Sequence, residues 1–378
     1  MRVVFTCGGT AGHINPAIAL AERLRREDPE GEILFIGGKG GMEENLIPRE
    51  GFSLRTIRIS NFQRRLTPAN ILHNIAAAWQ VFASRITARR MLKEFKPDVI
   101  VGMGGYASFP AMRAGAAMGI PVLVHEANAM PGLTTRMIAN RADKVMVAFE
   151  ESRQYYKHPE RVVVTGMPVR SEFLNLDKEG MKEKLGLAGK RLVVSAWGSL
   201  GARDMNRMME KFILLEAAEP EAPFVHIHAT GKYAEEWMPR ELSETGFEAE
   251  KHPDIRIVPY IYNMSELMVA ADVILSRAGA SSLNEIAASG TPSVIVPSPN
   301  VTANHQEKNA RVLERRGGAA VLLEKDCTGE LLYSTVKELM ENPEQRKKMS
   351  SAVRECAVLD SADRILAMIR EAAGGAVK

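Results

Sequence analysis

The chain has 378 residues, of which 46% are hydrophobic and 25% charged, a composition typical of a soluble globular protein with two domains. Its net charge of +3 conceals an asymmetry, because residues 1–170 carry 23 Lys and Arg against 15 Asp and Glu, whereas the remainder carries 26 against 31. The cysteines Cys7, Cys327 and Cys356 are too few and too scattered for a disulfide framework or a zinc site, so we expect a reducing compartment. No apolar stretch is long enough to span a bilayer, and Met1–Cys7 is predicted as a first strand rather than a signal peptide.

The chain begins with a strand, a glycine turn and a helix. Arg2–Cys7 is predicted as a buried strand and Gly8–His13 as the turn. The apolar spacing of Ile18, Leu20, Ala21 and Leu24 predicts a helix after it. This order is typical of a phosphate cradle, although the dinucleotide fingerprint and the P-loop are both absent. His13 either packs against the helix start or presents a polar side chain at the carboxyl ends of the strands.

A basic, apolar segment follows two further predicted strands at Glu32–Ile36 and Leu54–Ile59. Between Gly51 and Lys93 the chain has eight Lys and Arg and no acidic residue. Apolar residues recur there at helical spacing: Ile71, Leu72, Ile75, Trp79, Phe82 and Ile86. The segment is either a helix that covers the sheet or a surface for anionic lipid, and the missing acidic residues favour the lipid surface.

Three polar side chains follow a later strand of the first half. Pro121–Val124 is predicted as buried, and His125, Glu126 and Asn128 come directly after it. Polar groups at the end of a buried strand cost desolvation energy unless they face a cleft, so we expect a functional site here. The remaining strands of this half are predicted at Asp98–Gly102, Lys144–Ala148 and Arg161–Thr165, which together indicate a doubly wound parallel sheet.

The second half repeats the α/β pattern. Its strands are predicted at Arg191–Ala196, Phe224–Thr230, Ile255–Pro259, Val273–Leu275, Pro292–Pro297 and Ala319–Leu323, with a glycine turn at Gly198–Ala202. The turn Ser276–Gly279 leads into a helix whose unpaired N–H groups suit an anionic ligand. Ser281 and Ser282 either add hydroxyl donors or cap this helix. Glu285, one turn further on, either accepts hydrogen bonds from ribose hydroxyls or interacts favourably with the dipole of its own helix. We expect a ligand between the two halves.

Seven short motifs occur in one order along the chain: Gly8–His13, Gly104–Tyr106, His125–Asn128, Pro168–Arg170, Gly198–Ala202, Arg277–Glu285 and Asn304–Gln306. On these motifs the chain resembles the MurG-type glycosyltransferases over almost its whole length. The resemblance implies a GT-B fold, in which two Rossmann-like, doubly wound parallel-sheet domains face a cleft. It implies a first domain at residues 1–165, a second at 171–357, and a closing helix at about 358–378 that rejoins the first.

The resemblance also implies an activity and its partners. The enzymes move N-acetylglucosamine from UDP-N-acetylglucosamine to a muramoyl-peptide carried on undecaprenyl diphosphate, in peptidoglycan synthesis at the cytoplasmic face of the cell membrane. It therefore implies a peripheral protein on an anionic membrane surface, with Ile75, Trp79, Phe82, Arg85 and Arg89 in contact with lipid. No nucleic-acid partner is expected, because no basic and aromatic platform or recognition helix is visible.

The site residues carried over by the resemblance fall into two groups. On the donor side, Ile261 and Arg170 would contact the uracil base, and Glu285 would accept hydrogen bonds from the ribose hydroxyls. The diphosphate would be held by Ser199 and by the backbone N–H groups of Ala280, Ser281, Ser282 and Leu283. Asn284 of the same helix would belong to this site as well. The sugar side would be lined by Thr10, Ala11, Gly12, Asn128 and Gln306. The chain departs from the family pattern at Ala11, Ala127, Met167 and Leu200, and Leu200 removes an amide from the neighbourhood of the donor.

The expected reaction is a single inverting displacement at the anomeric carbon. Its general base would be His13, or His125 with Glu126 beside it. The chain has no Asp-x-Asp motif, so we expect helix N-termini rather than a metal to stabilise the leaving diphosphate, and no cofactor. The rivals are a UDP-sugar epimerase, another GT-B transferase with a lipid acceptor and a binding module without catalysis. A dehydrogenase is the weakest rival, because neither first strand is followed by a dinucleotide fingerprint.

Overall fold

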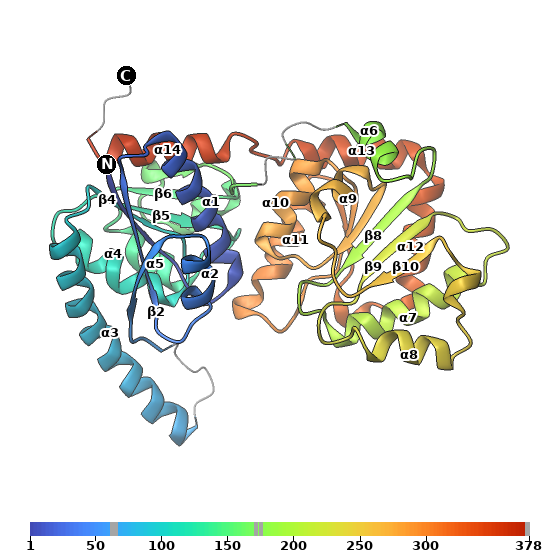
Figure 1. The fold of residues 1–378 in the computed structure, drawn as a ribbon, viewed down its shortest axis with the longest axis horizontal. Coiled ribbons are helices and arrows are strands. Elements are labelled where there is room, and N and C mark those ends of the chain that lie inside the picture. The colour runs from blue at the N-terminus through green and yellow to red at the C-terminus, as the bar shows by residue number, and fades with distance from the viewer. Residues whose placement is uncertain (61–66, 170–172, 174–176, 375–378) are drawn as a thin grey trace. The chain divides into compact units, whose positions relative to one another are not determined.

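The computed structural model describes residues 1–60, 67–169, 173 and 177–374, and only the backbone of residues 68–78 and 81. The chain divides into two compact units (Figure 1). The N-terminal unit comprises Met1–Pro168 together with Val358–Lys378, and the C-terminal unit comprises Val169–Ala357. The end of the chain therefore returns to the unit in which the chain began.

The N-terminal unit is built on a seven-stranded parallel sheet in the order β3-β2-β1-β4-β5-β6-β7. Its strands are β1 (Arg2–Thr6), β2 (Glu32–Gly38), β3 (Ser53–Ile57), β4 (Val99–Gly102), β5 (Val122–Glu126), β6 (Lys144–Val147) and β7 (Val162–Val164). Val3 pairs with Ile33 on one side and with Val99 on the other, so β1 lies between β2 and β4. The strand order reverses direction between β1 and β4, and open α/β sheets bind ligands at such a switch point.

Helices cover both faces of this sheet, which explains why its strands are apolar on both sides. They are α1 (Ala11–Glu27), α2 (Glu43–Arg49), α3 (Pro68–Phe95), α4 (Phe109–Ala116), α5 (Leu133–Ala139) and α14 (Ser361–Ala372). On one face, α1 and α14 lie side by side (Figure 1). Leu24 of α1 and Ile369 of α14 are buried with Phe5 in one apolar cluster. On the other face, Leu92 of α3 and Met112 of α4 belong to a second cluster.

Two ion pairs join α14 to α1: Arg23 with Asp363 and Arg370 with Glu27. Both pairs are partly exposed, so the apolar residues of α14 supply most of the stabilisation. The closing helix thus belongs to the N-terminal unit through its packing, and the charges fix its register along α1.

The C-terminal unit repeats this plan with a six-stranded parallel sheet in the order β10-β9-β8-β11-β12-β13. Its strands are β8 (Leu192–Ala196), β9 (Val225–Ala229), β10 (Ile255–Val258), β11 (Val273–Ser276), β12 (Ser293–Ile295) and β13 (Ala319–Val321). The switch point lies between β8 and β11, where Val194 pairs with Ile274. Strand β12 is shorter than the predicted Pro292–Pro297, since a proline at each end cannot donate to the ladder.

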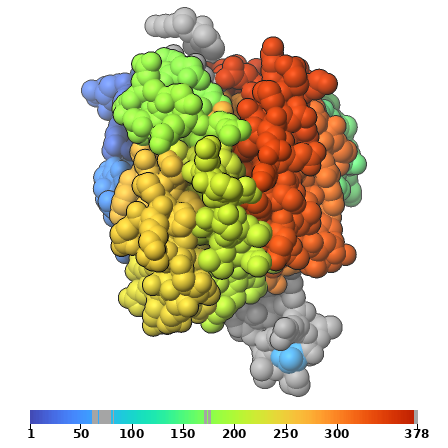
Figure 2. All heavy atoms as spheres, turned by 90° about the vertical axis from the view of Figure 1, so that its right-hand side faces the viewer, coloured from blue at the N-terminus to red at the C-terminus, as the bar shows by residue number. Residues whose placement is uncertain are grey.

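The helices of the C-terminal unit are α6 (Lys178–Lys184), α7 (Arg203–Ala217), α8 (Trp237–Glu244), α9 (Met264–Ala270), α10 (Ala280–Ser289), α11 (His305–Arg315), α12 (Gly329–Glu341) and α13 (Pro343–Arg354). Helices α7 and α12 pack side by side (Figure 2), and both contribute to the apolar cluster that includes Val193 of β8 and Val273 of β11. At their contact the rings of Phe212 and Tyr333 meet edge to face, with centroids 5.2 Å apart.

A buried polar network lies beneath this helical layer. The hydroxyl oxygen of Ser195 lies 2.8 Å from Nε2 of His226 and 2.7 Å from Nδ1 of His228. Nδ1 of His226 lies 2.8 Å from a carboxylate oxygen of Glu216. Burial, and to a smaller extent the neighbouring His226, lowers the pKa of His228 to about 3, so His228 is neutral in the folded protein.

The fold class predicted from the sequence, two doubly wound parallel sheets, is confirmed by this topology. The basic, apolar segment predicted as helical forms α3, which begins at Pro68. Two of the eight basic residues between Gly51 and Lys93, Arg64 and Arg65, lie outside the described residues. Of the helices in the described part of the chain, none combines the length and the apolar character that a membrane span requires.

Candidate active site

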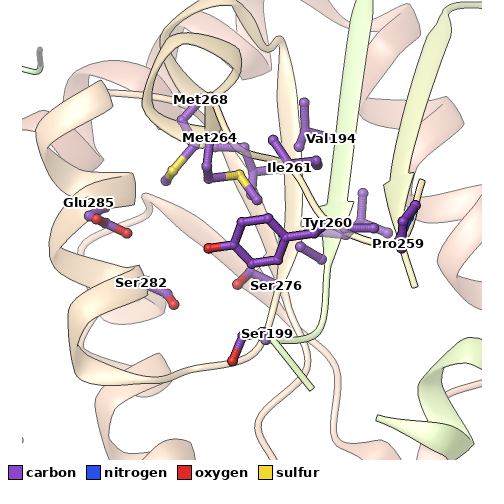
Figure 3. A pocket seen from close by; sticks show the side chains of 15 residues that line it. Val194, Ser199, Pro259, Tyr260, Ile261, Met264, Met268, Ser276, Ser282 and Glu285 are labelled. Atoms are coloured by element: carbon purple, nitrogen blue, oxygen red, sulfur yellow. The ribbon is translucent and has the colours of Figure 1, made fainter. Parts of the chain in front are cut away.

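A cavity of about 150 Å³ lies at the switch point of the C-terminal unit. It opens at the carboxyl ends of β8, β9 and β11, where Ala196, Ala229 and Ser276 line it. Figure 3 shows Ser282 and Glu285 of α10 facing the same space as Ser199 and the ring of Tyr260. The cavity therefore occupies the position at which this type of sheet binds nucleotides.

The polar side of the cavity is the N-terminal end of α10. Gly279 precedes the helix with an extended backbone and no capping side chain. Leu283 is the first residue of α10 whose amide reaches back to the turn, and it donates to the carbonyl of Gly279 at 3.0 Å. The N–H groups of Ala280, Ser281 and Ser282 consequently point out of the helix end, where an anion would be stabilised.

Two of the residues predicted to bind the nucleotide sugar, Leu283 and Asn284, make their contacts within α10 and do not line the cavity. Leu283 has a fully buried side chain, and its amide is used within the helix. Asn284 is buried, and its Nδ2 donates to the carbonyl of Ala280 at 2.8 Å. The prediction for these two residues is corrected, because the helical period turns them away from the side that carries Ser282 and Glu285.

The opposite wall of the cavity is apolar and aromatic. Ile261, which is 5% exposed, lies there with Met264, Met268 and Tyr260 (Figure 3). Such a wall suits a planar base, whereas the helix end suits phosphate and a carboxylate between them suits a sugar with vicinal hydroxyls. The order of these surfaces along the cavity matches the order of base, ribose and diphosphate in a nucleotide.

Gln306 fixes the turn from which α10 starts. Its Oε1 accepts hydrogen bonds from the amides of Ala278, at 3.2 Å, and Ser298, at 2.9 Å. The turn is also held by the partly buried ion pair between Arg277 and Glu324, 2.5 Å apart. The side-chain oxygen of Gln306 is therefore used within the protein, and its contact with a sugar stays a prediction.

In the N-terminal unit, glycine turns meet at the switch point between β1 and β4. A Cβ atom on Gly105, whose φ is +83°, would lie 1.9 Å from the carbonyl oxygen of Gly8, so only glycine permits this approach. The ring of His13 packs on the second turn, because a Cβ atom on Gly104 would lie 2.9 Å from its Nδ1. His13 is half-buried at the start of α1, and the adjoining Thr10–Gly12 is partly open to solvent.

The expectation that His125 and Glu126 face a cleft is corrected. His125 is 1% exposed, its Nε2 lies 2.8 Å from the carbonyl oxygen of Gly166, and burial lowers its pKa. Glu126 is 4% exposed, and its carboxylate accepts hydrogen bonds from the backbone amides of Asn128, at 3.0 Å, and Gly132, at 2.9 Å. These two side chains hold the loop after β5, and only Asn128 remains half-exposed.

Comparison with known proteins shows to which family the chain belongs. Residues 3–147 match the model described as the glycosyltransferase family 28 N-terminal domain, and residues 192–365 match the corresponding C-terminal domain. A UDP-N-acetylglucosamine–N-acetylmuramyl-(pentapeptide) pyrophosphoryl-undecaprenol N-acetylglucosamine transferase of a Thermoanaerobacter species is 41% identical over 371 residues, which cover 98% of this chain and 99% of the relative. The transferase of the same name from Acetivibrio thermocellus is 37% identical over 372 residues, with 98% of each chain covered. The crystal structure of MurG from Acinetobacter baumannii has a TM-score of 0.77 and 25% identity, covering 98% of this chain and 99% of that one.

The chain belongs to the MurG family of glycosyltransferases. The motif order that suggested this membership spans both units, from Gly8–His13 at the first switch point to Arg277–Glu285 at the second. Membership in the MurG family thus agrees with the glycine turns at the switch point of the N-terminal unit and with the open end of α10 at that of the C-terminal unit.

Several residues of this MurG-family site were not predicted from the sequence. Tyr260, Met264 and Ser276 line the cavity of the C-terminal unit, and their position beside Ile261 and before the turn to α10 was the available signal. In the N-terminal unit, Glu43 lies buried among the glycine turns, directly after the glycine run that ends β2. Arg170, predicted to lie against the base, is outside the described residues.

The predicted lipid-contacting residues of α3 separate into two faces. Trp79, Phe82 and Ile86 are 70%, 58% and 61% exposed, and the rings of Trp79 and Phe82 meet edge to face. Ala88 and Leu92 are fully buried in the unit. Arg89 is exposed and Arg85 half-buried, whereas the side chain of Ile75 is outside the described part. The described half of the stripe is therefore a surface feature and not part of the core.

Proposed function

We infer that this protein transfers N-acetylglucosamine from UDP-N-acetylglucosamine to a muramoyl-peptide carried on undecaprenyl diphosphate. The observation that carries the proposal is the donor cavity, which combines an open helix end, a carboxylate one turn further on and an apolar wall. Relatives at 37% and 41% identity over 98% of the chain bear the name of this transferase. The proposal therefore joins a nucleotide-shaped site to the activity named for its relatives.

In this proposal the C-terminal unit holds the donor. The uracil lies against Ile261 and Tyr260, and the carboxylate of Glu285 accepts the hydrogen bonds of the ribose hydroxyls. The diphosphate is held by Ser199, Ser282 and the amides at the start of α10. These donors also stabilise the charge that develops on UDP as it leaves.

The proposed reaction is one displacement with inversion. A hydroxyl oxygen of the acceptor forms a bond to C1 of the sugar while the bond from C1 to the β-phosphate oxygen breaks. UDP leaves with that electron pair, and the hydroxyl proton passes to a base in the N-terminal unit. His13 is the candidate for this base, since it is half-exposed at the switch point, whereas His125 is buried and engaged with Gly166.

We further propose that the N-terminal unit receives the acceptor at the cytoplasmic face of the cell membrane, as a peripheral protein. Trp79, Phe82 and Ile86 would enter the interface between headgroups and acyl chains, and Arg85 and Arg89 would meet anionic headgroups. The three free cysteines fit a reducing compartment.

Product analysis tests the proposed function. Incubation with UDP-N-acetylglucosamine and the lipid-linked muramoyl-peptide is expected to yield UDP and an acceptor heavier by one N-acetylhexosamine in mass spectra. Conversion of the donor into an epimer without acceptor would instead support a UDP-sugar epimerase. Donor binding without UDP release, in the presence of acceptor, would support a binding module.

A further inference from the structure

Glu43 places a buried carboxylate among the glycine turns of the N-terminal unit. Its side chain is the first of α2, and the residue is 1% exposed. Its Oε1 accepts hydrogen bonds from the amide of Gly9, at 3.3 Å, and from the amide of Gly38, at 3.2 Å. One carboxylate oxygen therefore ties the turn after β1 to the end of β2.

The glycines around Glu43 leave space for this carboxylate. A Cβ atom on Gly8 would lie 2.1 Å from Oε1, and one on Gly41 would lie 2.1 Å from Oε2. A Cβ atom on Gly37 would lie 3.0 Å from the Cγ of Glu43. Three separate positions thus lack a side chain where the side chain of Glu43 lies, which indicates that its placement is tightly defined.

The second oxygen of the carboxylate, Oε2, is buried and accepts no hydrogen bond from the described residues. A buried, incompletely satisfied carboxylate destabilises a fold relative to an apolar side chain of similar size. A role in stability alone does not account for such a residue, and groups of this kind call for a functional explanation.

The turn held by Glu43 leads directly into the candidate acceptor site. Gly9, with a φ of +88°, precedes Thr10, and three residues further on His13 packs against Gly104. A Cβ atom on Gly9 would lie 3.3 Å from the ring of Tyr106, so the turn also contacts the loop after β4. Burial and, to a smaller extent, the charge of Glu43 raise the pKa of Tyr106, which agrees with the position of the carboxylate near the loop after β4.

We propose that Glu43 is a positioning residue for the acceptor half of the reaction: by holding the amides of Gly9 and Gly38 it fixes the turn that presents Thr10–Gly12 and His13. This inference rests on the proposed transfer reaction. It differs from a general structural role because its effect is confined to the acceptor, while the donor cavity belongs to the other unit.

Replacement of Glu43 tests the proposal through a split between the two substrates. Glu43→Ala is expected to lower kcat/KM for the lipid acceptor at least about 30-fold, since a small misplacement of catalytic groups has effects of this size. The KM for UDP-N-acetylglucosamine and the affinity for UDP are expected to stay within about twofold. Glu43→Gln keeps the Oε1 acceptor and is expected to retain activity within about fivefold.

Gly41→Ala provides a second route that leaves the carboxylate in the chain. The new methyl group would collide only with Glu43 and is expected to displace its carboxylate, giving the same acceptor-selective loss. The double variant Gly41→Ala with Glu43→Ala is expected to be no worse than Glu43→Ala, because the colliding group is gone. Glu44→Ala, which removes the neighbouring exposed carboxylate, serves as the matched control and is expected to behave as the wild type.

Amide hydrogen exchange gives a readout that does not depend on the reaction. In Glu43→Ala the amide of Gly9 is expected to exchange at least about tenfold faster, while the amides of α10 keep their rates. Normal exchange at Gly9, unchanged acceptor kinetics, or equal losses for acceptor and donor would overturn the positioning role. A wild-type protein that transfers no sugar would refute the proposed function, and hydrogen exchange would still decide whether Glu43 holds the turn.

Discussion

His13, the proposed general base, has a half-exposed imidazole. It lies at the start of α1 with its ring against Gly104, so the backbone of two glycine turns determines its place. His125, the other histidine considered as a base, is buried and bonded to the carbonyl of Gly166. The structure thus separates two histidines that the sequence left as alternatives.

Replacing His13 tests its assignment as the base. We expect His13→Ala to lower turnover at least about a hundredfold, the lower range of general base catalysis, with the affinity for UDP unchanged. Steady-state kinetics at saturating donor and acceptor measure this effect. Near-normal turnover in His13→Ala would remove His13 from the role, and His125→Gln is the comparison that should affect stability more than chemistry.

His228 makes a pH-dependent contribution to the stability of the C-terminal unit. Its pKa of about 3 in the folded protein lies below the ordinary value of 6.5, so between these values the unfolded chain binds a proton that the folded chain does not. The contribution is fully present above pH 6.5 and is lost as the pH falls toward 3, by about 1.4 kcal/mol per pH unit.

Denaturant unfolding at several pH values measures this linkage. The difference in free energy of unfolding between the wild type and His228→Asn is expected to shrink as the pH falls from 7 to 5, because the variant lacks the titrating group. A difference that stays constant over this range would show that His228 does not titrate as the buried network requires.

At the scale of elements, α3 combines a buried face with an exposed aromatic one. Ala88 and Leu92 pack into the N-terminal unit, while Trp79 and Phe82 contact each other on the outside. Exposed aromatic side chains flanked by arginines are typical of helices that lie in a membrane interface. The exposure of Trp79 and Phe82 is therefore the structural basis of the proposed membrane contact.

Vesicle sedimentation tests this contact. The double change Trp79→Ser with Phe82→Ser is expected to weaken binding to anionic vesicles at least about tenfold, since burying each large apolar side chain contributes about 1.5–3 kcal/mol. Added salt should weaken the wild type further by screening the arginines. Tyr233→Ser, at an aromatic residue of the other unit that is 71% exposed, is the control and should leave binding unchanged. Equal binding by the double variant and the wild type would exclude this face of α3 as the lipid contact.

Elements were predictable where local patterns are strong. Apolar runs between glycine turns predicted the strands, and β12 is shorter than predicted because the proline at each end has no N–H to donate to the ladder. The helix beginning at Ala280 was predicted from the turn before it and is observed as α10. The strand order of the sheet, which local patterns do not show, places β8 beside β11 and so brings the turns that follow these two strands together.

Individual site residues were less predictable, for a physical reason. A polar side chain at the end of a strand can face a ligand or hold its own loop, and His125 and Glu126 do the latter. Glu43 could not be predicted, because its surroundings are assembled from turns after β1 and β2 that lie far apart in the sequence. The departures at Leu283 and Asn284 follow from the helical period of α10.

At the scale of the whole molecule, two units of similar topology serve different substrates in this account. Each has a switch point at the carboxyl ends of its central strands, and each presents a cradle there. The C-terminal unit adds a carboxylate and an apolar wall that fit a uridine nucleotide, whereas the N-terminal unit adds His13 and the exposed face of α3. The donor cavity is the part on which the proposed reaction most depends.

Titration of UDP and 2′-deoxy-UDP into the wild type and Glu285→Ala tests that dependence most directly. If Glu285 holds the ribose hydroxyls, the wild type should bind UDP at least about tenfold more tightly than the deoxy analogue, as expected for a hydrogen bond to a charged group. Glu285→Ala should bind both nucleotides equally weakly. Undiminished UDP affinity in Glu285→Ala, or the same preference for the ribose hydroxyl in both proteins, would contradict the assignment of the donor site.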